Sequence, residues 1–224
     1  MSWLMLRTIS VVALVSSVGA ALSAATARGG DIYVTNCIGV SGSIGEYTTS
    51  GAVVNASLVP ALNYPWGIAV SGSNLFVSNQ YGNTIGEYTT SGAVVNASLI
   101  SGLNQPESIA LSGSNLFVVN NLGGTIGEYT TSGAVVNTSL VSGLTYPQGI
   151  AVSGSNLFVA NNGSGTIGEY TTSGAVVNAS LVVSGLASPT CIAVVETPEP
   201  STLALLGAGA IGLLSYAWRR RVKG

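Results

Sequence analysis

The fold is decided by one stretch of sequence, IGEYTTSGAVVN at residues 44–55. The same twelve residues return at 85–96, 126–137 and 167–178, so the repeat has a period of 41 residues. A fixed period of this length is typical of repeat architectures, in which each unit is one supersecondary motif that packs on its neighbours.

A second block, IA(V/L)SGSNLFV, starts at Ile68, Ile109 and Ile150. Both blocks are rich in Val, Ile, Tyr and Phe and are broken by Gly, Asn and Ser, which indicates short strands and tight turns. No stretch inside the repeats has the length and apolar period of an amphipathic helix. The strands expected in one period are 67–70, 75–79, 84–89 and 93–99. Four strands in about 41 residues match one propeller blade, so we predict an all-β propeller of four four-stranded blades.

The two ends of the repeat array are staggered. Residues 31–36 match the second strand at 74–79, so the array begins on a second strand. Residues 191–195 match the first strand at 149–152, so the array ends on a first strand. We therefore predict that the last strand completes the first blade and closes the ring. A pair of chains forming an eight-bladed ring, or an open stack of blades, remains an alternative.

The two cysteines fall near this predicted closure. Cys37 follows the first strand of the array, and Cys191 precedes the last one. We predict a disulfide between them, which the loop-entropy model values at roughly 4–5 kcal/mol for so long a loop. The alternative is two unrelated, buried cysteines.

Residues 33–36 read Tyr-Val-Thr-Asn and are echoed by Phe-Val-x-Asn at 76–79, 117–120 and 158–161. Together with the Pro-x-Gly-Ile-Ala-Val segments, they resemble the YVTN and NHL propeller repeats over residues 31–195. The resemblance implies the fold and leaves the function open, because such propellers include both binding proteins and enzymes.

The N-terminus has the pattern of a secretory signal peptide. Arg7 precedes an apolar run over 9–22, and Ala25-Thr26-Ala27 offers a small-residue cleavage site. We predict a signal helix in residues 1–27 with cleavage after Ala27, or as second choice after Ala25. The alternative is a membrane helix that stays in place. The propeller then occupies residues 28–196, in an exported chain whose cysteines are free to oxidise.

The C-terminal residues 197–224 combine an apolar stretch from Leu203 to Trp218 with three arginines directly after it. This pattern indicates a short transmembrane helix with a cytoplasmic basic end. Pro198-Glu199-Pro200, the apolar helix and the basic cluster resemble, in this order, the PEP-CTERM sorting tail. The resemblance implies that an exosortase in the inner membrane of a Gram-negative bacterium recognises Pro198, Glu199 and Pro200. It also implies release to the cell surface or the polysaccharide matrix.

The composition excludes several classes of function. Only 6% of the 224 residues are charged, no histidine is present, and residues 31–195 contain no Lys or Arg. Without cations to neutralise phosphates, the protein is not expected to bind nucleic acid. Without histidine, it lacks the commonest general base and the commonest zinc ligand.

One glutamate recurs in each repeat, at Glu46, Glu87, Glu128 and Glu169. A ring of four carboxylates could hold a cation. However, these glutamates fall on the third strand, far from the axis of a usual blade, so we predict solvated charges and no metal or other cofactor.

The loops after the second strands carry asparagines, and aromatic residues lie near them in the sequence. Turn chemistry explains many of the asparagines. As a candidate face for sugars we nevertheless single out the following residues: Tyr64, Trp66, Asn79, Tyr81, Asn120 and Asn161.

The expected function is structural or adhesive. Propellers resembling this one include gluconolactonase-like enzymes, which use acidic and Asn metal ligands, and streptogramin-lyase-like enzymes, which use histidine. Because histidine is absent and acidic residues are expected only at positions that all blades share, we predict no catalytic residues. The preferred hypothesis is a non-enzymatic surface or matrix protein that binds a polysaccharide or a surface protein by repeated weak contacts. The alternative is a propeller enzyme acting on a lactone or a polysaccharide.

Overall fold

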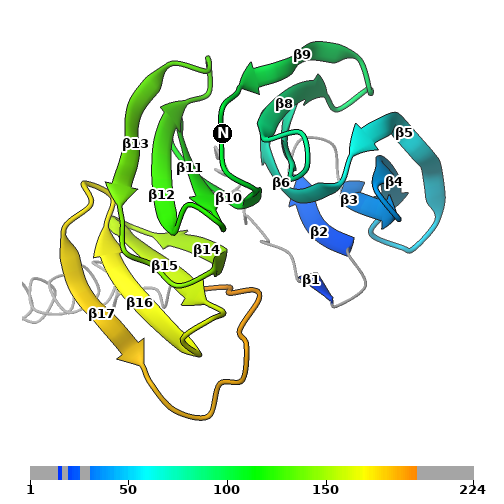
Figure 1. Cartoon of the computed structure of the whole chain (residues 1–224). Helices are drawn as coiled ribbons and strands as arrows, with labels where there is room; N and C mark the ends of the chain where they lie inside the picture. Colours follow the sequence, from blue (N-terminus) through cyan, green and yellow to red (C-terminus); the bar gives the residue numbers. More distant parts are fainter. Residues whose placement is uncertain (1–14, 17–19, 26–30, 196–224) are drawn as a thin grey trace, which may run out of the picture. The chain divides into compact units, whose positions relative to one another are not determined.

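The computed structural model describes residues 15–16, 20–25 and 31–195, which form strands joined by turns and loops (Figure 1). The strands belong to four antiparallel sheets, here called blades 1 to 4. Blade 1 consists of β1 (Val15–Ser16), β2 (Ala20–Ala25), β3 (Asp31–Ile38), β4 (Ser41–Thr48) and β5 (Val53–Asn63). Blade 2 consists of β6 (Pro65–Ser71), β7 (Asn74–Asn79), β8 (Thr84–Thr89) and β9 (Val94–Ile100).

Blades 3 and 4 repeat the order of blade 2. Blade 3 consists of β10 (Pro106–Ser112), β11 (Asn115–Asn120), β12 (Thr125–Thr130) and β13 (Val135–Val141). Blade 4 consists of β14 (Pro147–Ser153), β15 (Asn156–Asn161), β16 (Thr166–Thr171) and β17 (Val176–Val182). In each of these blades the chain order is also the spatial order, as in a β-meander. The predicted all-β fold of four propeller blades is confirmed.

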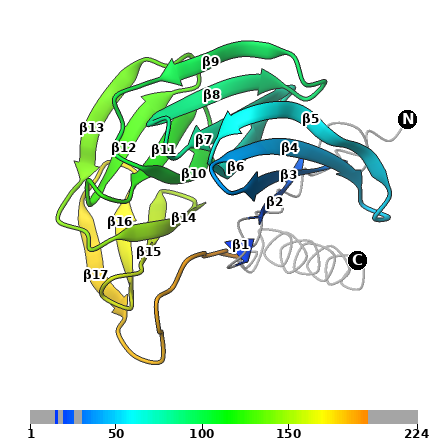
Figure 2. The ribbon, with the colours of Figure 1, turned by 45° about the vertical axis from the view of Figure 1, so that its right-hand side comes forward.

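The blades pack side by side through their inner strands. Strand β2 contacts β6, β6 contacts β10, and β10 contacts β14. Figure 2 shows the sheets of blades 1 to 3 following one another with β9 and β13 on the outside. The inner strands therefore line the axis, and the outer strands carry the exposed edges.

The turn between the first two strands of each complete blade explains the Ser-Gly-Ser-Asn block. In blade 2, Ser71 pairs with Asn74, so Gly72 and Ser73 form a two-residue hairpin loop. Gly72 has a φ of +57°, a value that glycine adopts readily at the first central position of a type II′ turn.

The apolar core lies between the blades. One cluster joins blades 1 and 2, a second joins blades 2 and 3, and a third joins blades 3 and 4. The second contains Phe76 and Ile85 of blade 2 together with Leu116 and Val118 of blade 3, all of them buried. Each blade is therefore stabilised chiefly by its neighbours, as expected of repeat proteins.

The glycine of each Gly-Glu-Tyr motif makes room for the tyrosine two residues later. A Cβ on Gly127 would lie 2.6 Å from Cε2 of Tyr129, and Gly86 and Gly168 face their own tyrosines in the same way. Tyr129 is only 2% exposed. This close approach accounts for the repetition of glycine at a position where a strand interior usually disfavours it.

Two predictions about the ends of the array are wrong for the residues described. The predicted signal helix includes β1 and β2, which are strands, and β2 pairs with β3 as the inner strand of blade 1. Residues 191–195, predicted to fill that place, form no strand. Strand β2 supplies the ladder partners that the edge of β3 needs, and an unpaired edge is costly when buried.

The remaining predicted helix, over residues 203–218, lies outside the described residues. Within the described ranges no helix is long and apolar enough to cross a membrane.

Candidate functional site

The repeats are nearly identical in their outer strands and differ mostly in two places. One place flanks the proline that begins each inner strand, at Pro65, Pro106 and Pro147. The other is the loop after the asparagine that ends each second strand. Residues that differ between otherwise identical repeats are the ones able to give the protein an asymmetric site.

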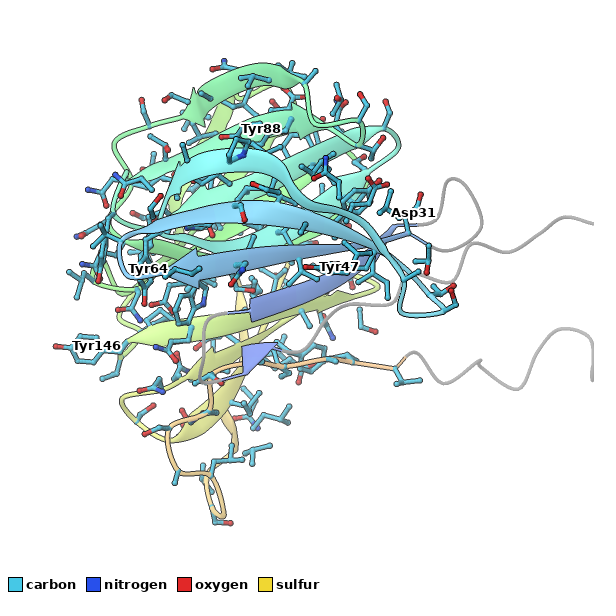
Figure 3. The ribbon with its side chains drawn as sticks, turned by 90° about the vertical axis from the view of Figure 1, so that its right-hand side faces the viewer. Asp31, Tyr47, Tyr64, Tyr88 and Tyr146 are labelled. Atoms are coloured by element: carbon cyan, nitrogen blue, oxygen red, sulfur yellow. The ribbon has the colours of Figure 1, made fainter. Side chains whose placement is uncertain are left out.

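The strand register brings these two places together. Pro65 pairs with Asn79, Pro106 with Asn120, and Pro147 with Asn161. The start of each inner strand and the end of the neighbouring strand therefore meet at one end of the blade. Figure 3 shows Tyr64 and Tyr146 at the same end of the strands, opposite Asp31.

We call this end the variable face and define it by the residues before and after the inner-strand prolines and those following the second-strand asparagines. Its members are Tyr64, Trp66, Gln105, Glu107, Tyr146, Gln148, Cys37, Gln80, Tyr81, Asn121 and Asn162.

Three aromatic rings stack at the blade 1–blade 2 part of this face. The ring of Tyr64 is 5.9 Å from that of Trp66 and 4.4 Å from that of Tyr81, with interplanar angles of 16° and 20°. Tyr81 is 49% exposed, whereas Tyr64 and Trp66 are half-buried. Tyr64 and Trp66 therefore form a rigid support that presents the ring of Tyr81 to solvent.

The backbone fixes this arrangement. Tyr64 has a φ of +53°, and the equivalent residues Gln105 and Tyr146 have φ values of +49° and +47°. The amide of Gln80 donates to the carbonyl of Tyr64 at 3.0 Å, which ties the loop of Tyr81 to the residue beneath its ring. Left-handed backbone at non-glycine residues is uncommon and gathers where a fold positions functional side chains.

A buried carboxyl group, that of Glu107, lies near Tyr64. It follows the inner-strand proline of blade 3, a position at which blades 2 and 4 have Trp66 and Gln148. Glu107 is 3% exposed, and its Oε1 accepts a hydrogen bond of 2.8 Å from Nε2 of Gln80 in blade 2. Among the residues that the structure describes, its Oε2 has no hydrogen-bond partner. Burial raises the pKa of Glu107 to about 8, although the hydrogen bond from Gln80 lowers it in part. At neutral pH the carboxyl group is therefore mostly protonated.

Glu107 overturns the expectation that acidic residues occur only at positions shared by all blades. Its equivalents are Trp66 in blade 2 and Gln148 in blade 4. Comparing the repeats position by position could have revealed it, because the residue after each proline differs in every blade.

A buried hydroxyl network joins this carboxyl residue to blade 2. Ser78 accepts a hydrogen bond of 2.7 Å from the amide of Gly67 and donates to the carbonyl of Glu107. In blade 1 the hydroxyl of Thr35, at the equivalent position, donates to the carbonyl of Trp66 at 2.7 Å. The starts of neighbouring inner strands are thus held together directly below the variable face.

The sequence-predicted sugar face is only partly brought together. Tyr64, Trp66 and Tyr81 lie in one cluster, as described. Asn79, Asn120 and Asn161 are instead buried within the blades, where each amide donates to a threonine of the following strand: Thr84, Thr125 and Thr166, respectively. These three asparagines hold the two strands together at their ends.

The repeated glutamates are mostly not the solvated charges predicted from the sequence. Glu87 and Glu128 are each 8% exposed. Each accepts a hydrogen bond of 2.7 Å from the asparagine of the Ser-Gly-Ser-Asn turn, Asn74 and Asn115, respectively. Within the described ranges, no three His, Cys, Asp or Glu side chains gather as a metal site would require.

The cysteines occupy different surroundings. The thiol of Cys37 donates to the carbonyl of Pro65 at 2.9 Å, and burial raises its pKa. Cys191 packs against Gly149 of β14. The disulfide between Cys37 and Cys191 stays a prediction.

Comparisons with known proteins bear on the tail and on the fold. Residues 196–221 match the model of the PEP-CTERM protein-sorting motif, which directs exosortase-dependent export to the bacterial cell surface. This match confirms the resemblance drawn from Pro198, Glu199 and Pro200. No protein with a curated description matches the chain significantly.

Several solved structures are similar in fold. A catalytically inactive virginiamycin B lyase from Staphylococcus aureus, solved with quinupristin, is 23% identical with a TM-score of 0.62, and the match covers 78% of this chain and 60% of the lyase. A streptogramin B lyase is 22% identical with a TM-score of 0.61, covering 82% of this chain and 72% of that one. An auxiliary nutrient binding protein from Bacteroides ovatus is 15% identical with a TM-score of 0.60, covering 76% and 53%. At these identities the similarity supports the propeller fold alone.

Proposed function

We propose that this protein is an exported, non-enzymatic propeller that binds a polysaccharide at the cell surface or in the extracellular matrix. The binding site is the stack of Tyr64, Trp66 and Tyr81 on its variable face. The observation that carries the proposal is the stack of Trp66, Tyr64 and Tyr81, which presents one ring to solvent. Flat apolar faces of sugars pack on exposed aromatic rings, and nearby amides and hydroxyls supply hydrogen bonds. The sorting motif at 196–221 supports the proposal, because exosortase-dependent export delivers the chain to the cell surface.

The surroundings of Tyr81 suit a neutral ligand. The described residues contain no Lys or Arg. Glu107, whose carboxyl group interacts electrostatically with the neighbouring Tyr64, is mostly protonated at neutral pH. Neutral sugars need no charged partner, whereas phosphates and acidic polymers need cations. A neutral glycan is therefore the favoured ligand.

We expect Tyr81→Ala to weaken binding of the chain to its host's matrix polysaccharide at least tenfold, equivalent to about 1.4 kcal/mol. The matched control is Tyr146→Ala, because Tyr146 is on the same face and is 55% exposed. The ring stacks found among the described residues do not include Tyr146. Binding is measured by co-sedimentation with the purified polysaccharide. Equal binding by both variants, with circular dichroism confirming that both are folded, would reject the proposed site.

The sorting motif gives a second prediction. Replacing Pro198, Glu199 and Pro200 together by alanine should abolish tail processing and leave the full-length chain in the membrane fraction. Fractionation followed by intact-mass measurement tests this, with Thr197→Ala as the neighbouring control. Unchanged release of the triple variant would show that another feature directs sorting.

An enzymatic role is the second candidate, and Glu107 is the residue that favours it. A carboxyl group confined to one blade, with a pKa near 8, has the property expected of a general acid. Against this role, Glu107 is only 3% exposed. Turnover of a lactone or a polysaccharide by the wild type, lost in Glu107→Gln, would establish the enzyme and displace the binding hypothesis.

A further inference from the structure

The inner strand of blade 1 comes from a segment that export is expected to remove. In β2, Ala20 pairs with Asn36, Leu22 with Val34, and Ala25 with Asp31. Both predicted cleavage points, after Ala25 and after Ala27, separate β2 from β3. Once the signal peptide is removed, the edge of β3 loses the strand that pairs with its N–H and C=O groups.

The chain carries a second segment with the sequence of an inner strand. Residues 189–194 read PTCIAV and match PWGIAV at 65–70, PESIAL at 106–111 and PQGIAV at 147–152. The three matching segments form β6, β10 and β14. Residues 189–194 form no strand in the structure, although they belong to the same compact unit as the blades.

This segment already occupies an inner-strand place on the side of blade 4. A Cβ on Gly149 of β14 would lie 2.9 Å from the Cα of Cys191 and 2.9 Å from the carbonyl oxygen of Thr190. The equivalent Gly67 of β6 faces the Cα of Ser108, at 3.0 Å, and the carbonyl of Glu107. Thr190 and Cys191 therefore lie against blade 4 as Glu107 and Ser108 lie against blade 2.

We propose that β2 is a temporary inner strand, and that residues 189–194 replace it on β3 when the signal peptide is cleaved. The proposal rests on the export assigned under Proposed function. Blade 2 sets the register, because Ile68 pairs with Val77, Ala69 with Phe76, and Val70 with Leu75.

Transferred to blade 1, this register places Ile192 opposite Val34, Ala193 opposite Tyr33, and Val194 opposite Ile32. The same segment then contacts blades 1 and 4 together and completes the array. The precursor would keep this array incomplete until it has crossed the membrane. Export and final folding would thereby be coupled.

The register also locates the cysteines. Gly149 pairs with Ala160, so the equivalent Cys191 would lie opposite Thr35, two residues before Cys37. Diagonal neighbours of this kind have Cα atoms about 7–8 Å apart, beyond the usual 4.4–6.8 Å of a disulfide. The strand replacement is therefore independent of a Cys37–Cys191 bond, which would need a local shift of the backbone.

The test is a disulfide trap in the chain that the host expresses from the full-length sequence and exports. Ile32→Cys and Val194→Cys are introduced together, with Cys37→Ser and Cys191→Ser removing the native thiols. A mild added oxidant takes two electrons and two protons from any thiol pair in contact. The experiment compares the processed chain with a variant whose cleavage is blocked by Ala25→Phe and Ala27→Phe. Peptide mass mapping identifies the linkage.

We expect a bond between positions 32 and 194 in the processed chain and none in the uncleaved one. The out-of-register control, Ile32→Cys with Ala193→Cys, should stay unlinked, because neighbouring residues of a strand point to opposite faces. Absence of the bond in the processed chain, equal bonding in both chains, or bonds between two chains would overturn the proposal.

A second measurement covers the case in which the cysteine variants fail to fold. Amide hydrogen exchange of residues 31–36 is compared in the processed wild type and in Ala193→Pro, because proline disrupts an inner strand. Protection in the wild type that is lost in the variant supports replacement. Equal protection in both would overturn it. Neither readout depends on polysaccharide binding, so failure here is distinguishable from failure of the proposed function.

Discussion

Gly127→Ala should destabilise the protein by about 2–3 kcal/mol, a large cost for a single methyl group. The added Cβ would lie 2.6 Å from the ring of Tyr129, which is 2% exposed and cannot move without disturbing the core between blades 2 and 3. Surface substitutions usually change stability by no more than about 0.5 kcal/mol, so this larger cost would show that the glycine of the Gly-Glu-Tyr motif is needed for packing. Urea denaturation followed by circular dichroism gives the free energy of unfolding.

A double-mutant cycle isolates the cause. In a Tyr129→Ala background the same Gly127→Ala change should cost under about 0.5 kcal/mol, because the ring that it meets is gone. Additive costs would mean that the backbone conformation, and not the Tyr129 ring, requires glycine at position 127. Ser142→Ala, at an exposed position, is the control for a change that meets no packed ring.

The second large effect is a dependence of stability on pH that originates in Glu107. Its pKa is about 8 in the folded protein and near 4.5 in an unfolded chain, so the folded protein holds a proton that the unfolded chain has lost. The free energy of unfolding should therefore fall as pH rises from about 4.5 to about 8, by at most about 1.4 kcal/mol per pH unit. Below pH 4.5 both states are protonated, and above pH 8 both are ionised, so the loss ends there.

Glu107→Gln separates this effect from all other titrations. The variant keeps a neutral polar side chain beside Gln80 and should lose most of the decline between pH 5 and pH 8. The difference between the wild-type and variant unfolding free energies, measured across that range, is the quantity of interest. A difference that stays constant with pH would show that the carboxyl group does not carry the effect. Glu128→Gln serves as the control at a shared position.

The sequence predicts the fold well because the same strand and turn pattern occurs four times along the chain. The period, the strand-forming residues and the turn glycines all indicate the same blade, and the structure has that blade. The ends of the array are less predictable, since two segments compete for one place. Residues 191–195 have the right pattern, but β2 is joined to β3 through only a short connection and pairs with it instead.

The candidate site is less predictable for a different reason. The sequence predicts that Tyr64, Trp66 and Tyr81 lie near one another, because all three are close to the loops in the chain. It does not predict how their rings stack, because the stacking depends on the left-handed backbone at Tyr64. Glu107 is not predicted by the repeat pattern, because it lies at a position where the blades differ and the pattern reports only what they share. The asparagines at the strand ends are polar residues near loops, yet their hydrogen bonds to threonines direct them into the blade.

The most direct test of the account is the location of the native protein in its host before and after enzymatic digestion of the matrix polysaccharide. We predict that the chain, with its tail removed near Pro198, is held in the matrix fraction and becomes soluble when the polysaccharide is digested. A full-length chain that stays in the membrane fraction, or a released chain that is soluble without digestion, would contradict the account.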